Sequence, residues 1–249
     1  MTMENCILRK RCKNFGTDKC SNYCYPYVFM HSTDGKGGFW ATRNVPKRYS
    51  NCFLDNLEIE KDNPKSYKKV VTYIEHVIDF VLGRGQGMYL VGATGTGKTS
   101  TAITILNEYL VARVIQHLKG EKKIEVNPVL FIKLSSFQNV YNSQFRGSSI
   151  VQNQNSDKYF IVKNNMKIVE LLVLDDIALR NATEAFQNEM YEIIDYRDTE
   201  GLATIFTSNE TYEGLEECLG ERIRSRVEGM CGKQILIKGA DRRSGGLWR

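Results

Sequence analysis

The sequence has 249 residues, of which 42% are hydrophobic and 25% charged, as is typical of a soluble globular protein. No apolar run approaches the ~20 residues that cross a bilayer, and the N-terminus lacks the order of a signal peptide, so we expect a cytoplasmic protein with no membrane partner. Residues 1–50 carry a net charge of +6, and the remainder carries −1. This asymmetry indicates a surface for nucleic acid or an acidic protein, or else a solvated basic face.

The first 39 residues form a cysteine-rich segment with too little apolar content to bury a core of its own. A structural metal would supply the missing folding energy, and four thiolates suit tetrahedral Zn²⁺. We therefore predict a small zinc-binding module over residues 1–39, in which the ligands are Cys6, Cys12, Cys20 and Cys24. His31 is a candidate to replace one of these cysteines as a ligand. Their spacing differs from that of common zinc modules, so reduced cysteines without metal are the alternative.

The rest of the chain predicts an α/β domain. Residues 40–65 are expected to be a connector, and residues 66–249 the domain itself. Continuous apolar runs are typical of strands in a parallel sheet covered by helices. Strands are predicted at residues 87–91, 129–132, 171–174, 203–209 and 234–237. Helices are predicted at residues 66–82, 99–119, 184–196 and 220–227, a loop at residues 146–155, and a loose basic tail at residues 241–246.

The segment after the first predicted strand fits the phosphate-loop pattern at every fixed position. It consists of Gly92, Ala93, Thr94, Gly95, Thr96, Gly97, Lys98 and Thr99. The glycines let successive N–H groups point at phosphate oxygens, and the helix that follows directs its positive dipole end at the anion. Lys98 places a charge on the β- and γ-phosphates, and Thr99 offers a hydroxyl to Mg²⁺. The segment predicts a site for a nucleoside triphosphate, with a glycine-rich turn as the alternative.

Two further strands end in polar side chains that suit the same chemistry. Asp175 and Asp176 follow the run at residues 171–174, at the end of a strand where α/β sheets bind ligands. Asp175 would hold Mg²⁺ through water, and Asp176 would polarise the attacking water as general base. Asn209 ends another strand and would orient that water or touch the γ-phosphate. A turn or helix N-cap is the alternative role for this asparagine.

Taken together, these motifs resemble those of AAA+ ATPases of the DnaC/DnaI type, the bacterial and phage loaders of the replicative helicase. The resemblance covers about residues 45–243. The matching segments are residues 45–49 as the connector before the core, 92–99 as Walker A, 171–176 as Walker B, 207–209 as sensor 1 and 220–226 as the arginine-finger segment. Walker B carries the Asp-Asp pair of this family in place of the commoner Asp-Glu.

The resemblance implies an AAA+ P-loop NTPase core, with a parallel five-stranded sheet of order 5-1-4-3-2 between helices. It also implies hydrolysis of ATP with Mg²⁺ and side-by-side self-association through the ATP sites. Asn209 takes the sensor 1 role, and Arg226 is the finger that reaches the neighbour's γ-phosphate, with Arg222 as second choice. The alternative is that Arg226 pairs within its own subunit and serves stability.

The partners that the resemblance implies are a replicative hexameric DNA helicase and single-stranded DNA. The helicase would be bound by the N-terminal module, and the DNA by helices within residues 135–168. There we expect Arg146, Lys158 and Tyr159 to contact DNA, unless Tyr159 and Phe160 are core residues.

Other functions fit part of the pattern. An IstB-like ATPase that assists a transposase shares most of the motifs, although the cysteine-rich N-terminus favours a loader. A small-molecule kinase would need a lid-like arginine cluster, and a GTPase an Asn-Lys-x-Asp motif, and neither occurs. A nucleotide-binding adaptor that does not hydrolyse ATP also fits, because Asp176 is shorter than the usual glutamate.

Overall fold

The centre of the molecule is a parallel five-stranded sheet, described here in a computed structural model that covers residues 6–179 and 182–242. The strands are β1 (Met88–Val91), β2 (Val129–Lys133), β3 (Leu171–Asp175), β4 (Ala203–Ser208) and β5 (Ile235–Leu236). Their order is β2-β3-β4-β1-β5, with every neighbouring pair parallel. The predicted α/β class and sheet order are therefore confirmed.

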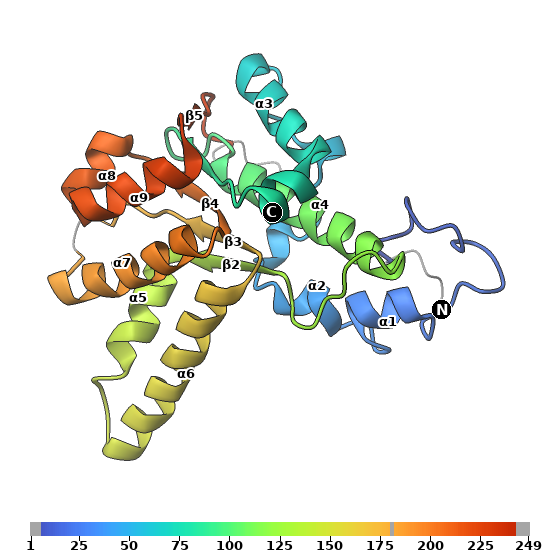
Figure 1. The fold of residues 1–249 in the computed structure, drawn as a ribbon, viewed down its shortest axis with the longest axis horizontal. Helices are drawn as coiled ribbons and strands as arrows, with labels where there is room; N and C mark the ends of the chain where they lie inside the picture. The colour runs from blue at the N-terminus through green and yellow to red at the C-terminus, as the bar shows by residue number, and fades with distance from the viewer. Residues whose placement is uncertain (1–5, 180–181, 243–249) are drawn as a thin grey trace.

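Helices cover both faces of the sheet (Figure 1). Side chains alternate along each strand, so Leu90 and Val173 belong to one buried cluster while Tyr89 and Leu174 belong to the other. The first face carries α3 (Pro64–Glu75) and α4 (Lys98–Leu118). The opposite face carries α5 (Leu134–Ser143), α6 (Ser149–Ile168), α7 (Glu184–Thr199), α8 (Tyr212–Leu219) and α9 (Glu221–Cys231).

The N-terminal segment packs on the first face. It contains α1 (Tyr25–His31) and α2 (Gly38–Thr42), and short 3₁₀ turns follow at η2 (Lys47–Tyr49) and η3 (Leu54–Asn56). Arg43 is 2% exposed, and its guanidinium lies 3.4 Å from the ring centroid of Trp40 and donates to Asn107 of α4. The connector is thereby fastened to the core through a cation–π contact and a buried hydrogen bond.

Two predicted elements differ from the structure. The helix expected over residues 66–82 ends at Glu75, and a π-helical turn, η4 (Asp79–Gly83), follows it. The polar stretch expected to be a loop, residues 146–155, is non-helical only up to Ser148, and its remainder forms the start of α6. Only Tyr159 and Met166 of α6 are buried, so few apolar positions mark this helix in the sequence.

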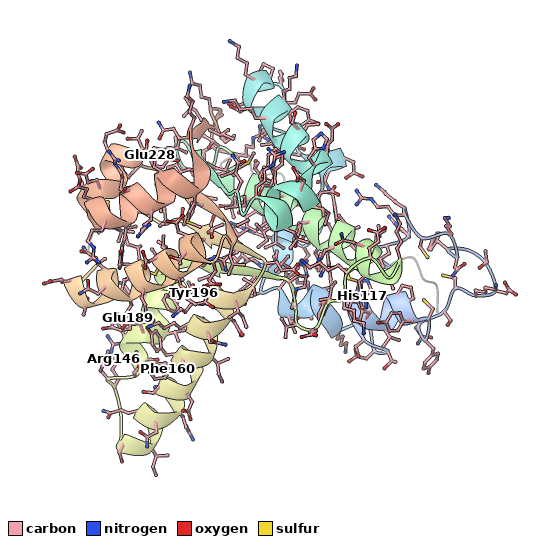
Figure 2. The ribbon with its side chains drawn as sticks, in the orientation of Figure 1. His117, Arg146, Phe160, Glu189, Tyr196 and Glu228 are labelled. Carbon is pink, nitrogen blue, oxygen red and sulfur yellow. The ribbon has the colours of Figure 1, made fainter. Side chains whose placement is uncertain are left out.

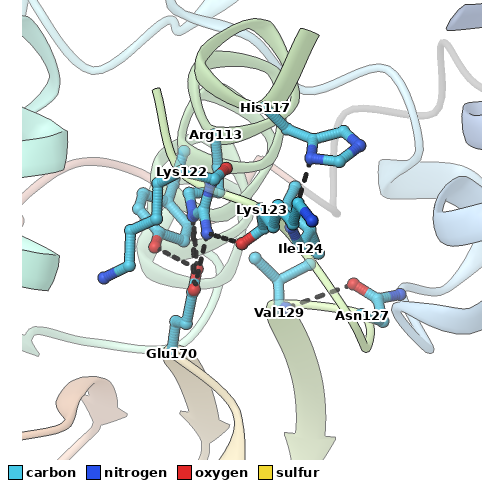
Figure 3. Close-up of polar contacts among 9 residues, drawn as sticks. Arg113, His117, Lys122, Lys123, Ile124, Asn127, Val129 and Glu170 are labelled. Carbon is cyan, nitrogen blue, oxygen red and sulfur yellow. Dashed lines mark hydrogen bonds and ion pairs between the residues drawn. The ribbon is translucent and has the colours of Figure 1, made fainter. Parts of the chain in front are cut away.

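A buried ion pair fastens the C-terminal half of α4 to the start of β3 (Figure 3). The guanidinium of Arg113, which is fully buried, pairs with the carboxylate of Glu170 at 3.0 Å. It also donates to the backbone carbonyls of Lys122 and Lys123. The hydroxyl of Tyr109 donates to the same carboxylate at 2.6 Å. Every strong polar group in this contact thus has a partner, as burial requires.

Within the described ranges, no helix combines the length and apolar character needed to span a membrane.

The Arg113 cluster yields a stability prediction. Replacing Arg113 by Met keeps most of the side-chain volume but leaves the Glu170 carboxylate with Tyr109 as its remaining donor and without a counter-charge, and it leaves two carbonyls without the guanidinium donor. Breaking a buried pair in this way costs about 3 kcal/mol or more of unfolding free energy, measured by urea denaturation. Arg224→Met is the matched control, because Arg224 is 34% exposed in its ion pairs and such pairs contribute below about 1 kcal/mol. Equal losses in both variants would contradict the prediction.

Candidate functional site

The predicted phosphate loop connects β1 to α4 and lies at the C-terminal edge of the sheet. Gly95 and Gly97 have φ angles of +80° and +107°, a region that favours glycine. Gly92 has no room for a side chain, because a Cβ there would lie 2.1 Å from the carbonyl oxygen of Ile237. The strand-loop-helix order expected from the sequence is therefore the observed one.

Lys98, the first residue of α4, is 5% exposed and turns back over the loop. Its Nζ donates to the carbonyl oxygens of Gly92 and Ala93 at 2.9 Å and 2.8 Å. It also donates to Oδ1 of Asn209 at 2.8 Å. The structure thus brings together two residues that are far apart in the sequence, and the amide of Asn209 reaches the phosphate loop.

Asp175 ends β3 and is 4% exposed. Its Oδ1 accepts hydrogen bonds from the hydroxyls of Thr99, at 2.8 Å, and Thr207, at 2.7 Å. Burial raises the pKa of this carboxyl group above its ordinary value, and the hydrogen bond from Thr207 opposes that rise. The Thr99 hydroxyl and the buried Asp175 carboxylate together offer oxygen ligands of the kind that a hard cation such as Mg²⁺ prefers.

Asp176 follows directly and points elsewhere. Its backbone has a φ angle of +56°, and its N–H donates to the hydroxyl of Thr207 at 3.0 Å. Its carboxylate, 38% exposed, lies 3.2 Å from Nζ of Lys133 at the end of β2. Thr207 and Lys133 are thus members of this site that were not predicted from the sequence, although Thr207 lies in the segment matched to sensor 1. Both follow buried strand residues, and that position was the signal that could have identified them.

The segment after β5 lies on the phosphate loop, whereas the sequence predicted a loose tail. The backbone N–H of Arg242 donates to the carbonyl of Gly95 at 3.1 Å, and the Asp241 carboxylate packs on the Cα of Gly95. The Arg242 guanidinium pairs with Asp62 at 3.3 Å and with Glu58 at 3.6 Å. The prediction was wrong for these two tail residues, and residues 243–246 lie outside the described ranges.

Arg226 and Arg222 of α9 face the same neighbour, α7. Arg226 forms ion pairs with Asp195 at 2.8 Å and with Asp198 at 3.0 Å and is 43% exposed. The Arg222 guanidinium lies 3.8 Å from the ring centroid of Tyr191. The predicted shared face is present, and within this single chain both arginines have partners on α7. The finger role of Arg226 stays a prediction.

The structure does not support the predicted zinc site. Over residues 6–179 and 182–242, no three His, Cys, Asp or Glu side chains are placed to hold a metal ion, and this includes the set Cys6, Cys12, Cys20 and Cys24. Cys6 is instead buried in the cluster that contains Leu8, Met30 and residues of α4, and desolvation raises its thiol pKa. Cys6 and Leu8 therefore gain apolar burial from the core, a source of folding energy that composition did not reveal.

His31 is not positioned as a substitute ligand either. Its Nε2 accepts a hydrogen bond from the N–H of Ile7 at 3.2 Å. Desolvation lowers the pKa of His31 to about 4, with a further contribution from Arg43. A neutral ring whose Nε2 lone pair is engaged serves as a structural acceptor for the N-terminal segment.

The helices α5 and α6 form a hairpin that projects from the body of the molecule (Figures 1 and 2). Tyr159 is 2% exposed, and its hydroxyl donates to Glu189 of α7, so the expectation that it contacts DNA is wrong. Phe160, its neighbour, is 59% exposed. Arg146 and Lys158 are exposed on the same hairpin, as Figure 2 shows for Arg146 and Phe160.

Similar sequences are found among helicase loaders. No protein-family profile matches the chain. The replicative helicase loader DnaC of Buchnera aphidicola subsp. Baizongia pistaciae is 28% identical over 183 residues, which are 74% of this chain and 65% of that protein. The aligned region therefore spans about two thirds of the relative's length.

One solved structure with the same fold is that of a DnaC helicase loader. It aligns with a TM-score of 0.56 and 23% identity, and the alignment covers 78% of this chain and all of that one. DnaI aligns with a TM-score of 0.58 and 23% identity over 80% of this chain and 95% of that one. The replication initiator DnaA, bound to AMPPCP and single-stranded DNA, aligns with a TM-score of 0.55 and 20% identity over 79% of this chain and 52% of that one. The chain is thus similar in sequence to the replicative helicase loader DnaC, and it has the fold of the DnaC, DnaI and DnaA structures.

Proposed function

We propose that this protein is an ATP-dependent loader of a replicative DNA helicase. The observation that carries the proposal is the convergence of Lys98, Asn209 and Asp175 on the phosphate loop, in a chain similar to DnaC. The DnaA structure with bound AMPPCP supports ATP as the nucleotide, because it has the same fold. The proposal assigns the chemistry to residues 66–249 and contact with the helicase to residues 1–39.

In the proposed mechanism the loop holds the triphosphate. Backbone N–H groups of residues 92–99 and the dipole of α4 face the phosphates, and Lys98 exchanges its carbonyl partners for phosphate oxygens. Thr99 and Asp175 would hold Mg²⁺, which when bound neutralises charge on the β- and γ-phosphates. Thr207 keeps the Asp175 carboxylate in place through its hydrogen bond.

Water activation falls to Asp176. Its carboxylate is more exposed than that of Asp175, and its ion pair with Lys133 lies at the C-terminal ends of β2 and β3. This position suits a general base that receives a proton from the attacking water. Asn209, already in contact with Lys98, orients that water or contacts the γ-phosphate.

Assembly completes the site in this proposal. Arg226 lies on an exposed helix and holds its present partners, Asp195 and Asp198, through ion pairs that water screens. Such pairs are easily exchanged for a neighbour's γ-phosphate when subunits lie side by side. An arginine supplied in this way stabilises charge that develops on the transferred phosphoryl group.

Single-stranded DNA is the second proposed ligand. The α5–α6 hairpin offers the exposed ring of Phe160 for stacking, with Arg146 and Lys158 available to phosphates. An IstB-like role beside a transposase and a nucleotide-binding adaptor remain the alternative functions.

The loader proposal predicts a complex with the replicative helicase of the host. Size-exclusion chromatography of the full chain with the purified helicase should give co-elution, and a variant that combines Lys13→Glu and Lys19→Glu, two exposed positions in residues 1–39, should lose it while it still binds ATP. Stable co-elution with a transposase, and none with the helicase, would establish the IstB-like alternative instead.

A paired substitution separates nucleotide binding from hydrolysis. Asp176→Asn should keep ATP affinity and lose at least about 100-fold in turnover, because the base acts on water and asparagine tolerates the positive φ at this position. Lys98→Ala should instead weaken ATP binding by about 10-fold or more, since it removes a charge that bonds the phosphates. Nucleotide titration and phosphate release measure both quantities, with the exposed Asp18→Asn as control.

If the parent protein shows no turnover with or without single-stranded DNA, the adaptor is the better description. If Asp176→Asn turns over ATP at the parent rate, the general base is another residue.

The arginine-finger proposal predicts complementation between variants. Arg226→Ala should bind ATP and melt within a few degrees of the parent, because its exposed ion pairs contribute no more than about 1 kcal/mol. Its turnover should fall on the order of 10³-fold. An equal mixture with Asp176→Asn should recover activity, since Arg226 of the Asp176→Asn subunit completes the site of a neighbouring Arg226→Ala subunit, and Arg224→Ala serves as a control on the same helix. A lower melting temperature without recovery would identify Arg226 as a structural residue only.

A further inference from the structure

A groove of about 640 Å³ lies between α3 and the start of β5, away from the proposed nucleotide site. Its floor is apolar and contains Tyr73, Phe80, Met88 and Ile235. The rings of Tyr73 and Phe80 stack with centroids 4.9 Å apart and an interplanar angle of 6°. We call this site the lysine groove, because its rim carries Lys65, Lys68, Lys69 and Lys233.

The charge of the lysine groove is unbalanced. None of the described residues that line it is acidic. Its four lysines are exposed, and no ion pair in the described part of the chain includes any of them. This differs from the lysines on α6, where Lys163 and Lys167 are paired with Glu192. Four adjacent positive charges without a counter-charge attract a polyanion.

The lysines also form a line. Lys65, Lys68, Lys69 and Thr72 follow the i, i+3, i+4, i+7 spacing of one helical face. From Lys65 to Thr72 this face extends ~10 Å along α3, so it can contact more than one phosphate of an extended strand. Lys233, two residues before β5, adds a fourth lysine to the lining from a different part of the chain.

The lysine groove is separate from the proposed ATP site. It includes Gly87 and Met88, at the N-terminal end of β1, whereas the phosphate loop follows the C-terminal end of the same strand. It also lies on α3, while the α5–α6 hairpin is on the opposite face of the sheet. A ligand in the lysine groove would therefore compete with neither of the proposed ligand sites.

We propose that the lysine groove binds single-stranded DNA, with phosphates on the lysines and an unpaired base against the apolar floor. The inference rests on the proposed function in naming DNA as the polyanion. Lysine ammonium groups are point charges that suit phosphates in variable positions, whereas arginine is favoured where a carboxylate is held by two bonds. Only an unpaired base can expose its flat face to the floor, because the bases of a duplex are stacked inside it.

The rival occupant is an acidic protein segment. It would satisfy the lysines through its carboxylates, but the carboxylates themselves leave the apolar surface of Tyr73, Phe80 and Met88 uncovered, whereas every nucleotide brings a phosphate and a flat base together. The floor therefore favours the nucleic acid, and the experiment below includes the acidic chain as a competitor.

The test uses the full chain and a fluorescent 20-nucleotide oligo-dT, with binding followed by anisotropy across a series of salt concentrations. The variant combines Lys65→Gln, Lys68→Gln and Lys69→Gln. We expect its affinity to fall about 10-fold at ~0.1 M salt, and the slope of log K against log salt to fall by about 2, for three lost phosphate contacts. The same three lysines changed to arginine should retain the parent affinity.

Two further variants make the result specific. Lys119→Gln, Lys122→Gln and Lys123→Gln together remove the same charge from the far end of α4, and we expect less than about a 3-fold loss from them. Arg146→Gln with Lys158→Gln tests the α5–α6 hairpin separately. ATP titration and a thermal melt of each variant verify that the fold and the nucleotide site are intact.

The outcomes are distinct. If the parent binds the oligonucleotide and the groove variant binds it with equal affinity and slope, the inference is overturned, while a loss in the hairpin variant would still support the proposed function. If poly-L-glutamate binds the parent, fails to bind the groove variant and leaves DNA binding unchanged, the groove is a protein-docking site. If the parent binds no single-stranded DNA, the DNA part of the proposed function fails together with this inference.

Discussion

The buried carboxylate of Asp175 determines the geometry of the candidate nucleotide site. It accepts hydrogen bonds from Thr99 on α4 and from Thr207 on β4, and so it fixes three elements relative to one another. Parallel pairing in register, with Leu174 opposite Phe206 and Val91 opposite Ser208, places these polar residues at one edge. Because the carboxylate is nearly closed off from water, its partners cannot be replaced by solvent without a cost.

The same edge is also bounded by the segment that follows β5. Ile237 passes so close to Gly92 that only glycine fits there, and Arg242 reaches the loop at Gly95. The phosphate loop is therefore enclosed on one side by residues from the end of the described chain. The position of β5, the last strand, therefore limits which residues can follow β1, the first strand.

The basic residues of the chain serve different purposes according to their burial. Arg113 and Arg197 are fully buried, and their donors are used on carbonyls and on one carboxylate, so they are part of the framework. The lysines of α3 are exposed and have no ionic partner among the described residues. The excess charge in residues 1–50 is likewise partly engaged, since Arg11 pairs with the buried carboxylate of Glu108 at 2.6 Å. Net charge alone could not distinguish these roles.

The sequence by itself predicted the strand-loop-helix segment at residues 87–119, the acidic end of β3 and the order of the five strands along the chain. These features are local: glycine at fixed spacing, apolar runs of strand length and the residue that ends each run can all be recognised without knowing what packs against them. The position of Asn209 against Lys98 needed the register of the sheet, although the polar end of its strand suggested it.

Only the tertiary structure decided that Cys6 and Tyr159 are buried and that residues 149–168 form the helix α6. Cys6 is buried against residues of α4, and Tyr159 against Phe137 and Glu189, and these neighbours are distant in sequence. A polar helix such as α6 has weak periodicity, so its helical state depends on the contacts that its few apolar residues make elsewhere. Burial is a property of the assembled chain, and for that reason composition could not show that Cys6 packs in the apolar core.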